Sequence, residues 1–185
     1  MKLFMKKMLN KNSTLSGRAK KINFFFSDVD GTLTDGNTYY SAKGEEMKKF
    51  SHIDGTGFFL LKKLDIDAGF ITGENSEIVK RRAEKLTLKY CFLGVQDKLT
   101  YIKNFAEKQN CLLENIAYIG DDLNDLLLIN SVGISFATNN AHTLIKEKCS
   151  ILLSKDGGNG AFREAVELLM KHREDSVWLN FSKTN

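Results

Sequence analysis

Aspartates gather directly after two apolar segments of the chain. Three of them follow the phenylalanines of "FFFSDVDGTLTDG", and three more lie in "YIGDDLND". Carboxylates crowded at one place repel each other unless some take up protons, and a hard divalent cation such as Mg²⁺ removes the repulsion. The two stretches therefore predict a magnesium site. The candidate carboxylates are Asp28, Asp30, Asp121, Asp122 and Asp125.

A hydroxyl and an amine follow two further apolar segments. Thr72 comes after "GFI", and Lys98 opens the segment that follows "GVQD". A cation, an ammonium group and a hydroxyl donor together suit a phosphoryl group, whose oxygens need this stabilisation during transfer. One aspartate can then attack as nucleophile, and another, two residues further on, can protonate the leaving oxygen and later activate water. The pattern predicts phosphoryl transfer through an aspartyl-phosphate.

Each of these features also has a purely structural explanation. An Asp-Gly pair is typical of a turn, acids are favoured at a helix N-terminus, and threonine often caps a helix. A lone lysine is usually solvated. Four such segments in order, each at the end of a predicted strand, favour the catalytic interpretation over these alternatives.

The elements that must position these residues alternate between strand and helix. Buried strands are predicted at 22–27, 68–71, 90–93, 116–119 and 132–136. Helices are predicted at about 55–64, 75–89, 97–109, 122–130, 141–148 and 160–172. The alternation predicts an α/β fold with a Rossmann-like, doubly wound parallel sheet. Ligands of such a sheet bind outside the carboxyl ends of its strands, which is where the candidate residues fall.

One segment interrupts the alternation. The stretch "TYYSAKGEEMKKF", within 34–50, predicts a β-hairpin inserted after the first strand, and no other insertion is large enough for a cap domain. We expect a basic flexible leader at 1–17 that runs into a short helix, one domain at 18–172 and a tail at 173–185. The glycines of "DGGNG" either present N–H groups to an anion or form a flexible turn.

Charge and cysteine content limit the partners. Seven of the 27 Lys and Arg residues fall within 1–21, which has no acid, so the rest of the chain carries 20 bases against 23 acids. This balance predicts no nucleic-acid partner, and no apolar run is long enough to predict a membrane span. Three widely spaced cysteines are typical of reduced thiols and predict a cytoplasmic protein.

The motifs "DVDGTLTDG", "ITG", "DK" and "YIGDDLND" resemble those of the haloacid dehalogenase (HAD) superfamily of phosphotransferases. More closely, "TDGNTYYSAKGEEMKKFSHIDGTG" and "GGNGAFREAVELLM" resemble its capless (C0) sugar-phosphate phosphatases. That group includes phosphatases of 3-deoxy-D-manno-octulosonate 8-phosphate and of nonulosonate 9-phosphates. The resemblance covers about residues 18–171 and implies a Mg²⁺-dependent phosphatase with a HAD-like fold and no cap domain.

The resemblance also implies roles for individual residues. Asp28 is the implied nucleophile and Asp30 the implied acid/base, while Thr72 and Lys98 are implied to bind the phosphoryl group. The implied ligands of Mg²⁺ are Asp28, the backbone carbonyl of Asp30, and Asp121, with Asp122 and Asp125 as supporting residues.

The substrate expected first is a nonulosonate 9-phosphate such as 2-keto-3-deoxynononate 9-phosphate. The stretch "TGENSEIVKRRAEKL" resembles the phosphatases of these sialic-acid-like sugars, in which the positions of Glu74, Arg82 and Lys85 are implied in substrate recognition. A glutamate can accept hydrogen bonds from sugar hydroxyls, and a base can pair with the carboxylate. The alternative substrate is 3-deoxy-D-manno-octulosonate 8-phosphate, whose phosphatases usually carry arginine at the position of Glu74. Arg82, Lys85 and Lys89 lie three and four residues apart and so form one helical stripe, which could instead be a solvated helix face.

Family members of this type form homotetramers, with the hairpin at the interface and a neighbouring subunit helping to close the site. The exposed tyrosines expected at Tyr39 and Tyr40 fit such an interface, and the alternative is that they pack on their own sheet. Two other functions remain as alternatives, a noncatalytic phosphatase-like interaction module and a broad phosphatase. The complete set of catalytic residues argues against the first of them.

Overall fold

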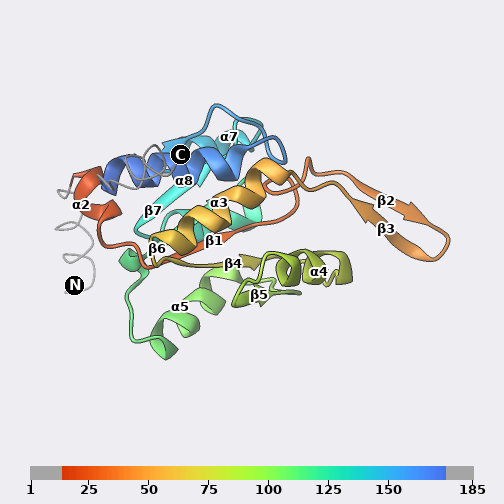
Figure 1. Ribbon diagram of the computed structural model, residues 1–185, viewed down its shortest axis with the longest axis horizontal. Helices are drawn as coiled ribbons and strands as arrows, with labels where there is room; N and C mark the ends of the chain where they lie inside the picture. The colour runs from red at the N-terminus through yellow and green to blue at the C-terminus, as the bar shows by residue number, and fades with distance from the viewer. Residues whose placement is uncertain (1–13, 174–185) are drawn as a thin grey trace, which may run out of the picture.

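The computed structural model describes residues 14–173, which fold around a six-stranded parallel sheet with helices on both faces (Figure 1). The strand order is β5-β4-β1-β6-β7-β8. The order reverses at β1, and a doubly wound sheet binds its ligands beside such a reversal. The strands of the sheet are β1 (Phe24–Ser27), β4 (Asp67–Ile71), β5 (Tyr90–Phe92), β6 (Ile116–Gly120), β7 (Ile134–Ala137) and β8 (Ile151–Leu152).

The central strand β1 is held by aromatic packing on both of its faces. Successive side chains of a strand point to opposite faces, so Phe25 and Phe26 enter different layers of the core. The Phe25 ring centroid lies 5.2 Å from that of Phe162, and the Phe26 centroid lies 5.1 Å from that of Phe105. Both phenylalanines are fully buried. This two-sided burial explains why β1 is an unbroken apolar run and fixes the position of the residues that follow it.

The helices divide between the two faces of the sheet. The layer of Phe25 contains side chains of α2, α3, α4 and α8, and the layer of Phe26 contains side chains of α5, α6 and α7. The helices of the first layer are α2 (Leu15–Ala19), α3 (His52–Lys63), α4 (Glu77–Lys85) and α8 (Ala161–Arg173). Those of the second are α5 (Lys98–Lys108), α6 (Leu126–Ile129) and α7 (Thr143–Lys148), and η2 (Leu113–Asn115) and η3 (Leu123–Asp125) are short 3₁₀ turns.

A two-stranded hairpin of β2 (Thr38–Ser41) and β3 (Gly44–Lys48) extends away from the body of the protein (Figure 1). It forms its own sheet, between β1 and α3 in the chain, as the sequence predicts. Tyr39, Tyr40 and Met47 expose 58%, 70% and 60% of their surface. The tyrosines therefore do not pack within the described part of the chain.

The α/β fold and the parallel sheet are confirmed, and two elements differ from the prediction. The helix predicted at 122–130 begins instead as the 3₁₀ turn η3 and becomes α-helical only over α6. The Asp125 carboxylate accepts the N–H groups of Asp121 and Asp122, and these bonds hold the tight turn. The strand β8 was not predicted, because two residues at a sheet edge give no periodic pattern.

The structure describes only part of the chain on either side of the expected domain boundaries. The helix α2 begins at Leu15, before the expected boundary at 18, and packs on α8, where the Ser16 hydroxyl donates to the His172 carbonyl. Residues 1–13 of the expected leader and 174–185 of the expected tail lie outside the described residues. Within residues 14–173, no helix combines the length and the apolar character needed to cross a bilayer.

The glycine-rich turn before α8 uses its N–H groups inside the protein. Gly157 donates to the Asn140 side chain, Gly158 to the Thr32 carbonyl and Gly160 to the Asp54 carboxylate. A Cβ on Gly157 would lie 1.8 Å from the Gly31 carbonyl oxygen, so the turn presses closely on the loop after β1. These contacts support the structural interpretation of the turn over the anion-binding one.

Candidate active site

The candidate residues lie together at the carboxyl ends of the strands. Asp28 follows β1, Thr72 follows β4 and Asp121 follows β6. The Asp28 N–H still bonds to the Ile119 carbonyl and the Thr72 N–H to the Phe92 carbonyl, so the sheet's hydrogen bonding fixes both backbones. A cleft of about 320 Å³ opens here. It is lined by Asp28, Asp30, Gly31, Gly36, Thr72, Gly73, Glu74, Asp121, Asp122 and Asn124.

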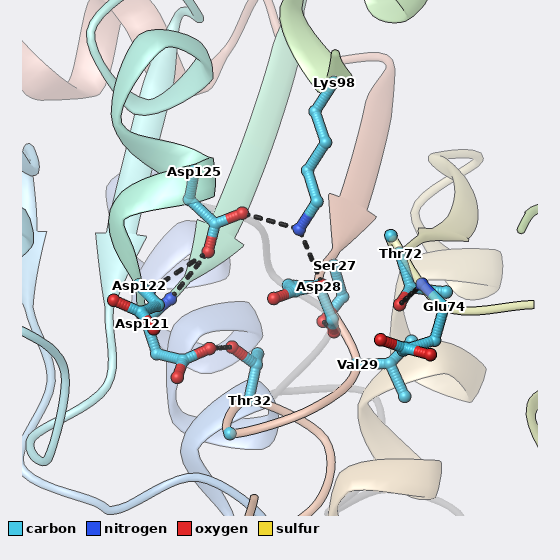
Figure 2. Close-up of polar contacts among 12 residues, drawn as sticks. Ser27, Asp28, Val29, Thr32, Thr72, Glu74, Lys98, Asp121, Asp122 and Asp125 are labelled. Carbon is cyan, nitrogen blue, oxygen red and sulfur yellow. Dashed lines mark hydrogen bonds and ion pairs between the residues drawn. The ribbon is translucent and has the colours of Figure 1, made fainter. Parts of the chain in front are cut away.

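The side chain of Lys98, the first residue of α5, points toward Asp28 and Asp125 (Figure 2). Its Nζ lies 2.7 Å from Asp28 Oδ1 and 2.7 Å from Asp125 Oδ1. The lysine side chain is only 1% exposed. Burial lowers the pKa of Lys98, but the charges of Asp28 and Asp125 outweigh burial and raise the pKa overall. Lys98 therefore stays charged beside the oxygen of Asp28.

Asp125 has both carboxylate oxygens occupied by hydrogen bonds. Its Oδ1 accepts from the Tyr118 hydroxyl at 2.6 Å as well as from Lys98, and its Oδ2 accepts from the N–H groups of Asp121 at 2.9 Å and Asp122 at 3.3 Å. A Cβ on Gly120 would lie 2.2 Å from Asp125 Oδ2, so only glycine fits there. Asp125 thus orients Lys98 and the turn after β6 rather than facing the cleft.

Asp121 is positioned from the loop after β1. The Thr32 hydroxyl donates to Asp121 Oδ1 at 2.8 Å (Figure 2). Gly31 has φ +81°, and a Cβ there would lie 2.0 Å from Asp121 Oδ2. The Asp-Gly pair after Asp28 therefore serves a definite purpose, because it lets the Asp121 carboxylate approach the β1 loop closely.

Burial, with a smaller contribution from neighbouring charges, raises the pKa values of two carboxyl groups in the cleft. Burial, followed by the charge of Asp125, raises the pKa of Asp28 to about 8, although Lys98 acts in the opposite direction. Burial likewise raises the pKa of Asp121 to about 7, although the hydrogen bond from Thr32 lowers it. Both groups would hold protons near neutral pH, and a bound cation would replace those protons.

The carboxylates fit a hard divalent cation. Oxygens of Asp28, Asp121 and Asp125 lie within 4.8 Å of one another. Because Asp125 is fully hydrogen-bonded, Asp28 and Asp121 are the two carboxylates that fit as ligands. An all-oxygen donor set of this kind is what Mg²⁺ favours. The third predicted ligand, the backbone carbonyl of Asp30, remains a prediction.

The hydroxyl of Thr72 lies on the other side of the cleft (Figure 2). Its Oγ1 accepts the N–H of Glu74 at 3.1 Å, which leaves the hydroxyl proton available to a ligand. Glu74 itself lines the cleft, as does Asp122, whose side chain accepts the N–H of Leu123 at 2.7 Å. These three residues lie where the sequence predicts a binding site.

Arg82 and Lys85 do not line this cleft. Arg82 donates to the Ser51 carbonyl at 2.9 Å, and its guanidinium carbon lies 5.4 Å from the centre of the Phe50 ring. Lys85 borders a different cavity, of about 430 Å³, between α3 and the end of α4. The described chain thus brings together Glu74 and the catalytic candidates but not the two basic residues predicted for recognition.

Sequence reasoning missed four residues that shape the site. Thr32 and Tyr118 bind the candidate carboxylates, Gly31 makes room for Asp121, and Lys48 binds Asp30. Thr32 and Gly31 stand inside the quoted motif "DVDGTLTDG", which gave a signal. Tyr118 opens the quoted motif "YIGDDLND" and Lys48 lies in the quoted hairpin stretch, but neither was singled out, because a tyrosine in a buried strand and a lysine in a hairpin have ordinary structural explanations.

The strand order and this edge of acidic residues with one buried lysine define a class of protein. Residues 93–163 match the model of the haloacid dehalogenase-like hydrolase family. A curated relative is 38% identical over 154 residues, covering 83% of this chain and 86% of the relative. The chain belongs to the haloacid dehalogenase-like hydrolases.

The relatives within the family carry a more specific name. The curated relative is the 3-deoxy-D-manno-octulosonate 8-phosphate phosphatase KdsC of Haemophilus influenzae. The cobalt-bound structure of the Haemophilus influenzae phosphatase is similar at 37% identity and a TM-score of 0.82, covering 86% of this chain and 93% of that one. The Moraxella catarrhalis phosphatase, in complex with magnesium, phosphate and KDO, has 35% identity and a TM-score of 0.87, covering 92% of this chain and 98% of that one.

These similarities confirm the predicted superfamily, the fold and the enzyme class, a phosphatase of the HAD type. The magnesium in the Moraxella catarrhalis structure and the carboxylate cluster of this chain both agree with the predicted cofactor. On the substrate, the relatives support the octulosonate 8-phosphate alternative better than the nonulosonate 9-phosphate expected first.

Proposed function

We propose that this protein is a Mg²⁺-dependent phosphatase that releases inorganic phosphate from a phosphorylated 2-keto-3-deoxy sugar acid. The observation that carries the proposal is the buried contact between Lys98 and Asp28, beside Asp121 at the carboxyl ends of β1 and β6. It presents a fixed carboxylate and a fixed positive charge at one point of the cleft, as attack on phosphorus requires.

Two of the aspartates divide the chemistry between them. A carboxylate oxygen of Asp28 forms a bond to phosphorus while the bond from phosphorus to the sugar oxygen breaks, and Asp30 gives that oxygen its proton. Asp30 then takes a proton from water, whose oxygen attacks the aspartyl-phosphate and returns Asp28 as a carboxylate. Lys98 and the Thr72 hydroxyl stabilise the charge on the phosphoryl oxygens. Asp28, Asp121 and the Asp30 carbonyl would hold Mg²⁺, which when bound would supply further positive charge to those oxygens.

The substrate that we propose first is 3-deoxy-D-manno-octulosonate 8-phosphate, because relatives that match more than four-fifths of the chain carry that name. The second candidate is a nonulosonate 9-phosphate such as 2-keto-3-deoxynononate 9-phosphate. It is favoured by Glu74, which lines the cleft where the sugar would extend from the phosphate and can accept hydrogen bonds from its hydroxyls. Arg82 and Lys85 belong to this second proposal.

The quaternary structure is part of the proposal. We infer a homotetramer with the hairpin at the interface, because Tyr39, Tyr40 and Met47 are exposed on the hairpin and a second subunit could cover them. A neighbouring copy could then supply the basic groups that the cleft lacks in one chain. Light scattering should give four times the chain mass, and Tyr40→Asp should lower it. We place the enzyme in the cytoplasm, because its three cysteines are unpaired.

Phosphate release with Mg²⁺ from the octulosonate 8-phosphate, 2-keto-3-deoxynononate 9-phosphate and N-acetylneuraminate 9-phosphate tests the proposal. Wild type and Glu74→Arg are compared, with Asp28→Asn as the inactive control. A wild-type preference for the octulosonate that Glu74→Arg leaves unchanged supports the first substrate. A nonulosonate preference that Glu74→Arg weakens supports the second. A wild type that neither binds Mg²⁺ nor hydrolyses an aryl phosphate supports the noncatalytic alternative.

A further inference from the structure

The hairpin places a second buried lysine against the other catalytic aspartate. Lys48, the last residue of β3, has Nζ 2.5 Å from Asp30 Oδ1, and its side chain is 2% exposed. The same Nζ lies 3.1 Å from Glu45 Oε1 and donates to the Thr38 hydroxyl oxygen at 3.0 Å. All three of its hydrogen-bonding positions are thus used, and two of them are used by the hairpin itself.

The contacts of Lys48 fix it from several directions. Thr38 and Glu45 belong to the two strands of the hairpin, and Glu45 also accepts a hydrogen bond from the hydroxyl of Ser76, the N-cap of α4. Burial lowers the pKa of Lys48, but Asp30 and Glu45 outweigh burial and raise it. Lys48 therefore stays charged, and its hydrogen bonds hold the ammonium group in one position.

The two oxygens of Asp30 are left in different states. Oδ1 accepts the ammonium of Lys48, whereas Oδ2 is buried and accepts no hydrogen bond from the described residues. Because the ammonium of Lys48 holds Oδ1, Oδ2 is the oxygen of this carboxyl group that has no competing partner among the described residues when it exchanges a proton with a leaving group. A protonated Oδ2 is also a donor, which is the form that a general acid needs.

We infer that Lys48 is a positioning residue for the acid/base Asp30, and that it holds Oδ1 so that Oδ2 is the oxygen that gives and takes the proton. The inference rests on the proposed function, because it assigns to Asp30 the acid/base step. The competing explanation is that Lys48 only anchors the hairpin to the body. Glu45→Gln separates the two, because it weakens the anchoring while the contact of Lys48 with Asp30 remains.

The test compares two leaving groups in the first turnover with Mg²⁺. p-Nitrophenol leaves without a proton, whereas the sugar oxygen of the preferred sugar-acid phosphate must receive one. General acid catalysis contributes about 10²–10⁴-fold, so Lys48→Met should slow the first turnover of the sugar phosphate about 10²-fold. The rate of the p-nitrophenol burst should change by less than about 3-fold, because this leaving group needs no proton. Steady-state release after the burst should be slow, because hydrolysis of the aspartyl-phosphate also needs Asp30.

Lys49→Met is the matched control, because Lys49 is the next residue, is 69% exposed in its side chain and contacts Asp35 instead. It should leave both first turnovers unchanged, and Glu45→Gln should keep the wild-type ratio between the leaving groups. If Lys48→Met does not fold, Lys48→Gln is measured with the same expectation.

The inference would be overturned if Lys48→Met slowed the first turnover of both esters equally. It would also be overturned if Glu45→Gln slowed the sugar phosphate selectively, as Lys48→Met is expected to do. Failure of the proposed function itself looks different. In that case the wild type hydrolyses neither ester, and Asp28→Asn differs from it in neither reaction.

Discussion

Two buried lysines, one from the body and one from the hairpin, hold the two proposed catalytic aspartates in different ways. Lys98 joins Asp28 to Asp125, and the side chains of these partners are 7% and 0% exposed. Lys48 joins Asp30 to Glu45, whose side chains are 27% and 20% exposed. The proposed nucleophile is thus fixed by the core, whereas the proposed acid/base is fixed by an appendage at the surface.

The difference separates what each lysine contributes. Lys98 neutralises charge that the fold has already buried, so its loss leaves two carboxylates uncompensated in the interior. The partners of Lys48 are partly exposed, so they can regain water when the lysine is lost. We therefore expect the first lysine to matter for folding and chemistry together, and the second mainly for the chemistry.

The largest expected effect of a substitution is that of Lys98→Met on stability. Removing one partner of a buried ion pair costs about 3–5 kcal/mol, because the other partner is left charged and buried. Lys48→Met should cost about 1–2 kcal/mol, because its partners are partly solvated. Urea unfolding of both variants measures the difference. Lys103→Met, an exposed change on the same helix α5, is the control for Lys98→Met and should change the unfolding free energy by less than about 0.5 kcal/mol. Equal losses in the two lysine variants would remove the contrast between core and hairpin.

Metal-free protein should lose stability as the pH rises from about 4 to about 8. The folded-state pKa values of Asp28, about 8, and Asp121, about 7, lie above the ordinary value of 3.8. In this interval the folded state keeps protons that the unfolded chain has released, so the free energy of unfolding falls by up to about 1.4 kcal/mol per pH unit for each group. Mg²⁺ replaces these protons, so it should stabilise the protein more at about pH 8 than at about pH 5.5.

Thermal unfolding in EDTA and in Mg²⁺ at the two pH values measures this effect. Asp121→Asn removes one titrating group and one ligand, so the variant should show a smaller fall with pH and a smaller gain from Mg²⁺. A metal-free wild type that gains stability toward pH 8 would contradict the prediction. So would a Mg²⁺ effect that is the same at both pH values.

That the candidate catalytic residues lie together was predictable from the sequence, because strand ends and motifs coincide. In a parallel sheet, Asp28, Thr72 and Asp121 must reach one edge once their strands are assigned. Lys98 opens a helix beside that edge. The hairpin contact was not predictable in the same way, since the position of Lys48 depends on where an inserted segment folds back. Nor could the sequence distinguish η3 from a helix, because the tight turn depends on a side-chain bond of Asp125.

The contacts of the basic residues predicted for substrate recognition could not be predicted from the sequence. The stripe of Arg82, Lys85 and Lys89 suggested one binding face, but Lys89 forms an ion pair with Asp67 and Arg82 turns toward Phe50 and Ser51. Helical spacing gives the face of a residue but not the atoms that face it. A role for these residues in recognition is part of the homotetramer that we propose.

The smallest expected effect is that of Arg82→Met, which tests the contrast between structure and recognition. It removes the hydrogen bond to the Ser51 carbonyl and the contact with the Phe50 ring, so stability should fall by about 1–2 kcal/mol. Arg81→Met, an exposed neighbour on α4, should change stability by less than about 0.5 kcal/mol. A role in recognition adds a second expectation, a KM about 10-fold higher at unchanged kcat, because ground-state and transition-state binding fall together. A KM within about 2-fold of the wild-type value, together with a loss of stability, would limit Arg82 to a structural role in joining α4 to the start of α3. Glu74 would then be the one recognition candidate that lines the cleft.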